Sequence, residues 1–307
     1  MSETVDGRAD TPVAEASISV VIIHYRAPLW CAEAVRSVLE SEGVATSVVV
    51  VDNSGDLSAM PNGVRVIRPT ENVGYAGGAN LALREWLSSG QQYCFVAAHD
   101  LTVEPHTLAR LVGVAESNPD FGVIAPWFTP RVARVGELGE VAGITEFTWV
   151  SGSGYLLRRE LLEQIGLFDE DFGSYCEDRE LCMRARINGW RVGAVRGAGA
   201  SSRGSAHHDT ANVMMHGNQI LLRIKYRDWR EALKLVLHEI RSIPAELLAA
   251  LSPSRSTRDA LRRAKIHART IAMASVKTFR WRIRGGQRGD PLSAQRRMPV
   301  ASGDHRS

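Results

Sequence analysis

Carboxylates occupy three places in this chain where they could take part in chemistry on a bound ligand. Asp52 and Asp100 each follow an apolar run, and Glu177 and Asp178 are adjacent at the start of a helical pattern. A carboxylate so placed can accept hydrogen bonds from hydroxyl or base N–H groups, hold a divalent cation, or remove a proton from a hydroxyl. The structural alternatives are an Asx-turn at Asp52 and helix capping at Glu177 and Asp178.

A stretch rich in small residues lies between the first two carboxylates. Residues 72–80 read Asn-Val-Gly-Tyr-Ala-Gly-Gly-Ala-Asn. Gly74, Gly77 and Gly78 permit positive φ and let a backbone approach a ligand closely, although a plain tight turn would need the same residues. The pattern predicts a glycine-rich turn followed by a helix from about Gly78 to Leu87.

Alternating strands and helices position these groups. Residues 18–23 are continuous and β-branched, which is typical of a buried parallel strand, and residues 29–39 carry apolar side chains at helical spacing. Because ligands bind outside the carboxyl ends of parallel strands, Asp52 and Asp100 are expected to face one crevice. Further strands are predicted at residues 47–51, 64–67, 93–97, 121–127 and 155–157.

The composition fits one folded domain with an appendage. The chain has 307 residues, 44% of them hydrophobic and 23% charged, and a formal net charge of +3. Its four cysteines show no C-x-x-C pairing, which indicates reduced structural thiols and a cytoplasmic location. Residues 1–17 are polar, and no window approaches about 18 apolar residues. We therefore expect a disordered leader at residues 1–17, no signal peptide and no spanning helix.

Four segments in this order resemble the family 2 inverting glycosyltransferases, especially their rhamnosyltransferase-like branch. They are residues 51–54, residues 72–80, Asp100 with the run before it, and the Glu177-Asp178 pair between residues 166–172 and 189–192. The resemblance implies a GT-A-like α/β fold, a Rossmann-type and mostly parallel sheet flanked by helices, over residues 18–228. It also implies transfer of a sugar from a nucleotide-diphosphate donor, such as dTDP-rhamnose, to a hydroxyl of a glycan or glycolipid.

Two other interpretations stay open beside this resemblance. A non-catalytic nucleotide-sugar-binding relative would share the fold without the reaction. A sugar nucleotidyltransferase would share the sheet and the nucleotide, but its glycine-rich loop with Arg and Pro-Lys is absent after Ile23.

The resemblance also distributes roles among residues. Asp178 is implied as the base that deprotonates the acceptor hydroxyl, and Glu177 as an acceptor contact or substitute base. The sugar or acceptor pocket takes Trp149, Ser151 and Gly152, with core packing as the alternative for Trp149, and acceptor-specific loops are expected between residues 129 and 146. The residues implied in donor binding are His24, Tyr25, Asp52, Asn53, Asn72, Gly74, Tyr75, Gly78, Asn80 and His99.

A divalent cation, Mn²⁺ or Mg²⁺, is implied at Asp100, where it would bridge the donor phosphates. His99 beside it is either a second ligand or a structural hydrogen-bonding group, and imidazole would favour Mn²⁺. Relatives often have a histidine near residues 197–201, but this chain has its nearest ones at His207 and His208. Arginines 196 and 203 could instead balance the diphosphate charge directly.

The residues after 228 differ from the rest of the chain in being rich in basic side chains. Residues 229–284 are predicted to be a helical extension, and residues 285–307 a disordered tail. Residues 255–288 carry eleven Arg and Lys residues against Asp259 as the sole acid. Such a segment can lie on anionic lipid at the inner face of a membrane, and a solvated face or a homo-oligomer contact are the alternatives. No nucleic-acid-binding module accompanies the charge, so nucleic acid is not expected as a partner.

Overall fold

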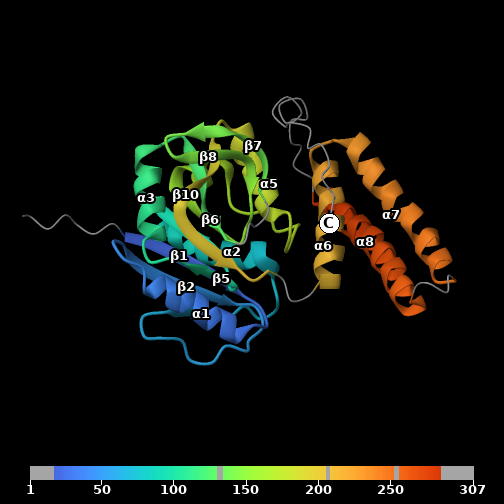
Figure 1. Cartoon of the computed structure of the whole chain (residues 1–307), viewed down its shortest axis with the longest axis horizontal. Coiled ribbons are helices and arrows are strands. Elements are labelled where there is room, and N and C mark those ends of the chain that lie inside the picture. Colours follow the sequence, from blue (N-terminus) through green and yellow to red (C-terminus); the bar gives the residue numbers. More distant parts are fainter. Residues whose placement is uncertain (1–16, 130–133, 205–207, 252–255, 285–307) are drawn as a thin grey trace, which may run out of the picture.

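The computed structural model describes residues 17–129, 134–204, 208–251 and 256–284 (Figure 1). The strands are β1 (Ser17–His24), β2 (Ala45–Asp52), β3 (Arg65–Ile67), β4 (Tyr93–Ala98), β5 (Leu101–Val103), β6 (Phe121–Phe128), β7 (Arg134–Val141), β8 (Ile144–Val150), β9 (Gly154–Arg158) and β10 (Arg191–Ser202). The helices are α1 (Pro28–Leu39), α2 (Gly74–Ser88), α3 (Thr107–Ser117), α4 (Arg159–Ile165), α5 (Glu177–Ile187), α6 (His208–Lys225), α7 (Trp229–Ala249) and α8 (Thr257–Ile283).

The strands form one mixed sheet in the order β3-β2-β1-β4-β9-β6-β10-β8-β7, with β5 paired to β10. Strands β3, β2, β1 and β4 are parallel, as are β6 and β10, and β9 lies antiparallel between the two groups. In the β1–β2 register His24 is opposite Asp52, so both residues reach the carboxyl edge together. The predicted α/β fold, with its parallel strands and flanking helices, is confirmed.

Two apolar cores cover the two faces of the sheet because side chains alternate along each strand. In β1, Val20 and Ile22 pack with α1 and α3 on one face, and Val21 and Ile23 pack with α2, α4 and α5 on the other. The runs of apolar residues in β1, β2 and β4 are therefore buried on both sides, as expected for central parallel strands. The four cysteines, at positions 31, 94, 176 and 182, are free and buried.

Helix α2 begins earlier than the sequence predicts. It starts at Gly74 instead of Gly78, so most of the expected glycine-rich turn is its first two turns. Of the three glycines, Gly74 has a positive φ, +75°, whereas Gly77 and Gly78 are helical. A Cβ at Gly78 would lie 3.2 Å from the Asn53 side chain, so the missing side chain lets α2 lie close to the sheet.

The segment expected to be loops between residues 129 and 146 contains a hairpin, apart from residues 130–133, which lie outside the described residues. Strands β7 and β8 pair antiparallel, and Ala142 and Gly143 between them have φ of +50° and +78°. Positive φ at both central residues matches the right-handed twist of a two-residue hairpin. Gly136 and Gly139 interrupt the alternation of apolar and polar residues by which β7 could have been recognised in the sequence.

Helices α6, α7 and α8 pack against one another beside the sheet (Figure 1). Glu239 of α7 is 3% exposed and pairs with His216 of α6 at 3.2 Å and His267 of α8 at 2.7 Å. The predicted boundary at residue 228 falls at the turn between α6 and α7, inside this three-helix unit. None of the described helices is both long and apolar enough to cross a bilayer.

Candidate active site

The loop before α5 holds a backbone conformation that is costly for its residues. Tyr175 and Cys176, the last two residues before the helix, have φ of +70° and +71° although neither is glycine. Each such residue costs on the order of 1–3 kcal/mol and persists only where its surroundings fix it. Glu177 and Asp178 come next and form the first turn of α5. The direction of both carboxylates therefore depends on what holds this loop.

Helix α2 holds one side of the loop. The Asn80 side chain donates to the Phe168 carbonyl at 2.9 Å and accepts from the Phe168 amide at 3.0 Å. The Tyr75 amide donates to Ser174 Oγ at 2.9 Å, and the Ala76 amide donates to a loop carbonyl at 2.8 Å. The two motifs singled out in the sequence, residues 72–80 and the segment before Glu177, are therefore in direct contact.

Asp178 is joined to the loop between β8 and β9. Its Oδ2 accepts from the Gly152 amide and its Oδ1 from the Arg179 amide, each at 2.7 Å. The Tyr75 hydroxyl donates to the Gly152 carbonyl at 2.7 Å. Gly152, Tyr75 and Asp178, each predicted as a site residue, are thus brought together, and the half-buried Asp178 carboxylate is held in one orientation.

The two carboxylates have raised pKa values. Burial raises the pKa of Glu177 well above its ordinary 4.5, and the neighbouring Asp178 raises it further. Burial also raises the pKa of Asp178 above 3.8, against the opposing effect of the amides of Gly152 and Arg179. Glu177 is 5% exposed, and its Oε2 has no hydrogen-bond partner among the described residues. A carboxylate pair of this kind accepts a proton more readily than ordinary surface acids.

The predicted sugar pocket residues lie around Asp178. The Trp149 ring packs in the core beside the guanidinium of Arg179, 5.9 Å from the ring centre, and its Nε1 is buried without a partner in the described parts of the chain. The Ser151 hydroxyl is 3.1 Å from that of Ser153. The core-packing alternative for Trp149 agrees with these contacts, and pocket roles for Trp149 and Ser151 stay predictions.

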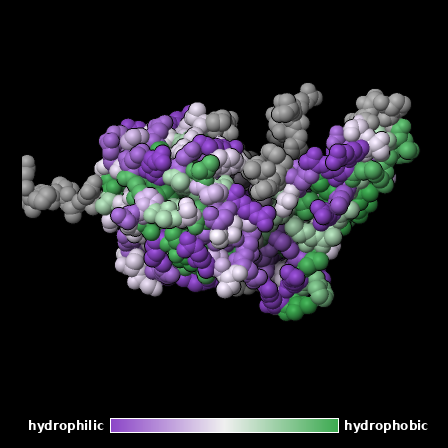
Figure 2. All heavy atoms as spheres, turned by 90° about the horizontal axis from the view of Figure 1, so that it is seen from below, coloured by the Kyte–Doolittle hydropathy of each residue, from purple (hydrophilic) through white to green (hydrophobic). Residues whose placement is uncertain are grey.

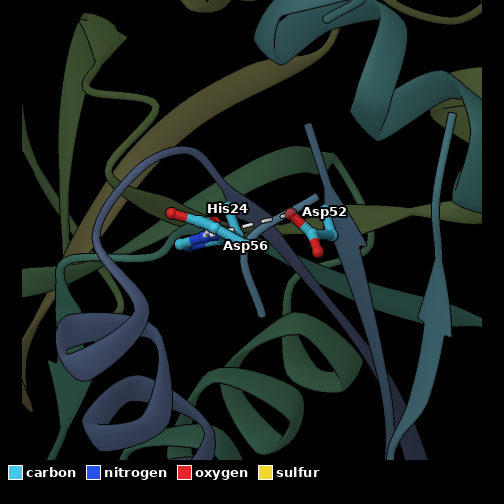
Figure 3. Close-up of side chains that lie close together, drawn as sticks. All are labelled: His24, Asp52 and Asp56. Carbon is cyan, nitrogen blue, oxygen red and sulfur yellow. Dashed lines mark hydrogen bonds and ion pairs between the residues drawn. The ribbon is translucent and has the colours of Figure 1, made fainter. Parts of the chain in front are cut away.

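A second group of side chains lies at the carboxyl ends of β1 and β2 (Figure 3). His24 is buried, with Nε2 2.7 Å from Asp56 Oδ1 and 4.0 Å from Asp52 Oδ1. Asp52 accepts amide hydrogen bonds from Gly55 at 2.8 Å and Leu57 at 3.2 Å. It therefore organises its own loop, as the Asx-turn alternative expects. Asp56 was not predicted, and the only sequence signal for it is a second carboxylate four residues after Asp52.

Other residues predicted to bind the donor connect the end of β2 to the start of α2, at the carboxyl edge of the sheet. Asn53 donates to the Gly74 carbonyl at 3.0 Å, and Asn72 accepts from the Gly74 amide at 2.9 Å. Tyr25 is half-buried, with the guanidinium of Arg26 5.1 Å from its ring centre. Donor binding by these residues, and by Asn80 and Gly78, stays a prediction.

Asp100 is 9% exposed and connects β4 to the end of β10. Its Oδ2 accepts from Ser202 Oγ at 2.6 Å and from the Gly204 amide at 2.7 Å. Its Oδ1 receives no hydrogen bond from any described residue. Next to it, His99 Nδ1 is 3.1 Å from the Ile23 carbonyl. A carbonyl only accepts, so Nδ1 carries the proton and Nε2 has the lone pair of the neutral ring.

One group among the described side chains could hold a divalent cation, and the single carboxylate of Asp100 is the other candidate. His24, Asp52 and Asp56 each offer a ligand atom, and these atoms lie within 4.8 Å of one another. One imidazole and two carboxylates suit Mn²⁺, but Asp52 already accepts several amide hydrogen bonds. Asp100 offers its Oδ1, which receives no hydrogen bond from the part of the chain that the structure describes. His207 and His208 are the histidines nearest to the place where relatives often have one. His207 lies outside the described residues, and so does the side chain of His208.

The two arginines considered as diphosphate partners are differently placed. The amide of Arg203 is 3.4 Å from the Asp100 carbonyl, and its side chain pairs with Glu33. Arg196 stands over Trp127, 4.3 Å from the ring centre, and 3.9 Å from Glu140. Arg203 is therefore the one that the backbone places beside Asp100.

A parallel half-sheet with carboxylates at its edge, continued by antiparallel strands and a carboxylate pair at the start of α5, defines a glycosyltransferase fold of the GT-A type. The chain belongs to the family described as "Glycosyl transferase family group 2", whose model matches residues 103–289, and the model described as "Glycosyl transferase family 2" matches residues 19–166.

Two curated relatives are similar in sequence. The low-salt glycan biosynthesis hexosyltransferase Agl10 of Haloferax volcanii is 23% identical over 200 residues, covering 57% of this chain and 64% of that protein. The uncharacterized protein Rv1525 of Mycobacterium tuberculosis is 28% identical over 163 residues, covering 50% of this chain and 61% of that protein. The chain thus spans less than two thirds of the length of these relatives.

Two solved structures share the fold. The mannosyltransferase PcManGT from Pyrobaculum calidifontis, in complex with GDP-Man and Mn²⁺, superposes with a TM-score of 0.51 at 17% identity, over 85% of this chain and 86% of that one. GalNAc-T7 with UDP, GalNAc and Mn²⁺ superposes with a TM-score of 0.53 at 13% identity, over 83% of this chain and 55% of that one. At these identities the likeness shows the fold alone.

The contact between α2 and the loop before α5 yields a test at Gly74. A Cβ there would lie 2.7 Å from the Gly173 carbonyl oxygen, and φ is +75°. Gly90 is the matched control, because its φ is +81° but a Cβ would meet nothing within 4 Å. Gly90→Ala should lower the free energy of unfolding by about 1 kcal/mol. Gly74→Ala should lower it by about 2–4 kcal/mol, since backbone strain and overpacking add.

Urea unfolding followed by circular dichroism measures both variants. Equal losses for the two substitutions would show that the loop yields to the added methyl group and is not held by α2.

Proposed function

We propose that the chain is an inverting glycosyltransferase that moves a hexose from a nucleoside diphosphate to a hydroxyl of a glycan or lipid-linked glycan, with Asp178 as the base. The observation that carries this proposal is the Asp178 carboxylate, half-buried at the N-terminus of α5 and oriented by the amides of Gly152 and Arg179. Inversion requires a base on the face of the sugar opposite the leaving diphosphate, within hydrogen-bond reach of the acceptor hydroxyl.

The proposed donor is a uridine or thymidine diphosphate sugar, and rhamnose is the sugar to test first. Support for a nucleotide sugar comes from family membership and from the complexes with GDP-Man and with UDP and GalNAc named above. Support for rhamnose is the sequence resemblance at Asp100, where one carboxylate stands in place of two. The glycan acceptor is suggested by the hexosyltransferase Agl10, whose name places it in glycan biosynthesis.

We further propose that a divalent cation is held at Asp100. The support is its place at the end of β4, its burial, and its Oδ1 without a hydrogen bond among the described residues. A cation there would neutralise charge that develops on the leaving diphosphate. Asp100 itself supplies a fixed carboxylate, because Ser202 and Gly204 hold its other oxygen.

We also propose that the three-helix unit rests on an anionic membrane surface, where a lipid-linked acceptor would be found. Four of the basic residues of the C-terminal segment take part in intramolecular contacts, because Arg262, Arg263 and Arg284 pair with acids of other segments and Lys277 donates to the loop before α5. Others are exposed on α8, namely Arg258, Lys265, Arg269, Arg280 and Arg282.

An apolar surface accompanies these charges. Figure 2 shows hydrophobic residues gathered over the outer part of the helical unit. On α7 the exposed ones are Leu233, Ile240, Leu247 and Leu248, and on α8 they are Leu261, Val276, Phe279 and Ile283. Basic and apolar side chains together suit the interface of an anionic bilayer.

The first prediction for this function concerns the base. Asp178→Asn should lower turnover by about 10²-fold or more while leaving donor affinity within about threefold, because only proton transfer is lost. Burial raises the pKa of Asp178, so wild-type turnover should increase with pH through a value above the ordinary 3.8, and the variant should lack this limb. Steady-state transfer assays and donor calorimetry measure these quantities. Turnover within threefold of wild type would remove Asp178 from the reaction.

The second prediction separates the two candidate cation sites. Asp100→Asn keeps the shape of the side chain but removes its charge, so it should weaken Mn²⁺ binding at least tenfold, measured by paramagnetic resonance of the free ion. Asp56→Asn is the matched control and should leave Mn²⁺ affinity unchanged. The reverse pattern would place the cation at His24, Asp52 and Asp56. No Mn²⁺ binding by the wild type would leave Arg203 as the charge partner of the diphosphate.

The third prediction concerns the membrane. Each basic residue near an anionic surface contributes about 1 kcal/mol, so neutralising three should lower the vesicle partition coefficient about 100-fold at low salt. The variant carries Gln at Lys265, Arg269 and Arg280, which are exposed. Its control carries Gln at Arg36, Arg65 and Arg110, which are exposed on the sheet domain. If the two variants sediment equally with phosphatidylglycerol vesicles, the basic residues of α8 do not bind the membrane. The helical unit would then be an oligomer contact or a solvated surface.

A further inference from the structure

The three-helix unit reaches into the loop that precedes α5. Asn218 of α6 is fully buried, and its Nδ2 donates to the carbonyls of Phe172 at 2.8 Å, Ser174 at 2.8 Å and Tyr175 at 2.6 Å. These carbonyls belong to the turn in which Tyr175 takes its left-handed conformation. The two N–H bonds of this one side chain are therefore shared among three backbone acceptors of the loop.

Lys277 of α8 completes this contact. Its Nζ donates to Asn218 Oδ1 at 2.8 Å and to the Phe172 carbonyl at 2.5 Å. The helices come close enough because position 217 of α6 is glycine. A Cβ there would lie 2.2 Å from the Met273 methyl group and 3.3 Å from the Thr270 carbonyl. The Asn218 amide is thereby fixed in the orientation that directs its N–H groups to the loop.

The charge of Lys277 also faces the carboxylates of the site. Burial lowers the pKa of Lys277 to about 8, whereas Glu177 and Asp171 act to raise it. In return, Lys277 lowers the pKa of Glu177. Near neutral pH the ammonium group is therefore protonated, and its charge acts on the buried carboxylate of Glu177. A neutral donor could satisfy the Phe172 carbonyl equally well. The charge of Lys277 therefore has a further effect, which is to lower the pKa of Glu177.

We propose that Asn218 and Lys277 are positioning residues for sugar transfer, which fix residues 172–176 so that Glu177 and Asp178 are presented to the acceptor. The three-helix unit is then a part of the active site as well as a membrane-facing appendage. This inference rests on the role proposed for Asp178 above. It predicts that losing either contact lowers kcat and leaves donor binding intact, because the edge formed by β1, β2 and β4 is untouched.

The test compares Lys277→Met, Asn218→Asp and Lys277→Arg in the full chain. Lys277→Met and Asn218→Asp should each lower kcat at least tenfold while the donor KM stays within threefold. Lys277→Arg, which keeps the charge and the donors, should retain kcat within about threefold. Amide hydrogen exchange in residues 172–176 should be faster in Lys277→Met, since the carbonyls of the loop lose a donor.

Arg263→Met is the matched control. It removes another α8 contact, the 2.8 Å pair between Arg263 and Glu246 of α7, without touching the loop. It should therefore lower the melting temperature to a similar extent but keep kcat.

Asp178→Asn distinguishes the two proposals. If it retains turnover, the base assignment fails, and the positioning role is judged by kcat of Lys277→Met and Asn218→Asp alone. Wild-type kcat in both of these variants, or an equal loss of kcat in Arg263→Met, would overturn the positioning role.

Discussion

The turn at Phe172–Cys176 is the constraint on which the rest of this site depends. It contains two consecutive left-handed residues that are not glycine, so its conformation is not favoured by its own sequence. The turn is kept by hydrogen bonds from three helices that are far apart in the chain. The amides of Tyr75 and Ala76 at the start of α2 donate to the turn, and Asn218 and Lys277 donate to it as well. The first turn of α5 takes its direction from this arrangement.

Electrostatic effects at that helix start oppose one another. Burial and mutual repulsion disfavour two charges on Glu177 and Asp178, whereas the amides of the first turn and the Lys277 ammonium favour them. The result is an acidic pair with raised pKa values, one member buried and one directed by Gly152. A base must be able to reach its substrate, which the buried Glu177 cannot do. The proposed assignment of Asp178, and not Glu177, as the base agrees with this difference in burial.

The central sheet could be predicted from sequence because its strands are buried on both faces and therefore continuous in apolar residues. β1, β2, β4 and β6 accordingly lie within a few residues of their predicted bounds. β7 could not be predicted, since glycines break its alternation. The start of α2 was predicted four residues late because glycines in a helix resemble a turn. Asn218 and Lys277 carry no local signal, and Asp56 is marked only by its spacing from Asp52. Their importance arises only when packing brings β1 to the loop after β2, and α6 and α8 to the loop before α5.

The position of Lys277 near the end of the described chain has a consequence for synthesis. The parallel pairings among β3, β2, β1 and β4 all lie within residues 17–98, so they can form while the second half of the protein is still being made, although β4 gains its other neighbour, β9, only later. The turn before α5 acquires its second set of hydrogen bonds only after α8 has left the ribosome. The turn that orients Glu177 and Asp178 is therefore completed later in synthesis than the parallel strands of the sheet edge.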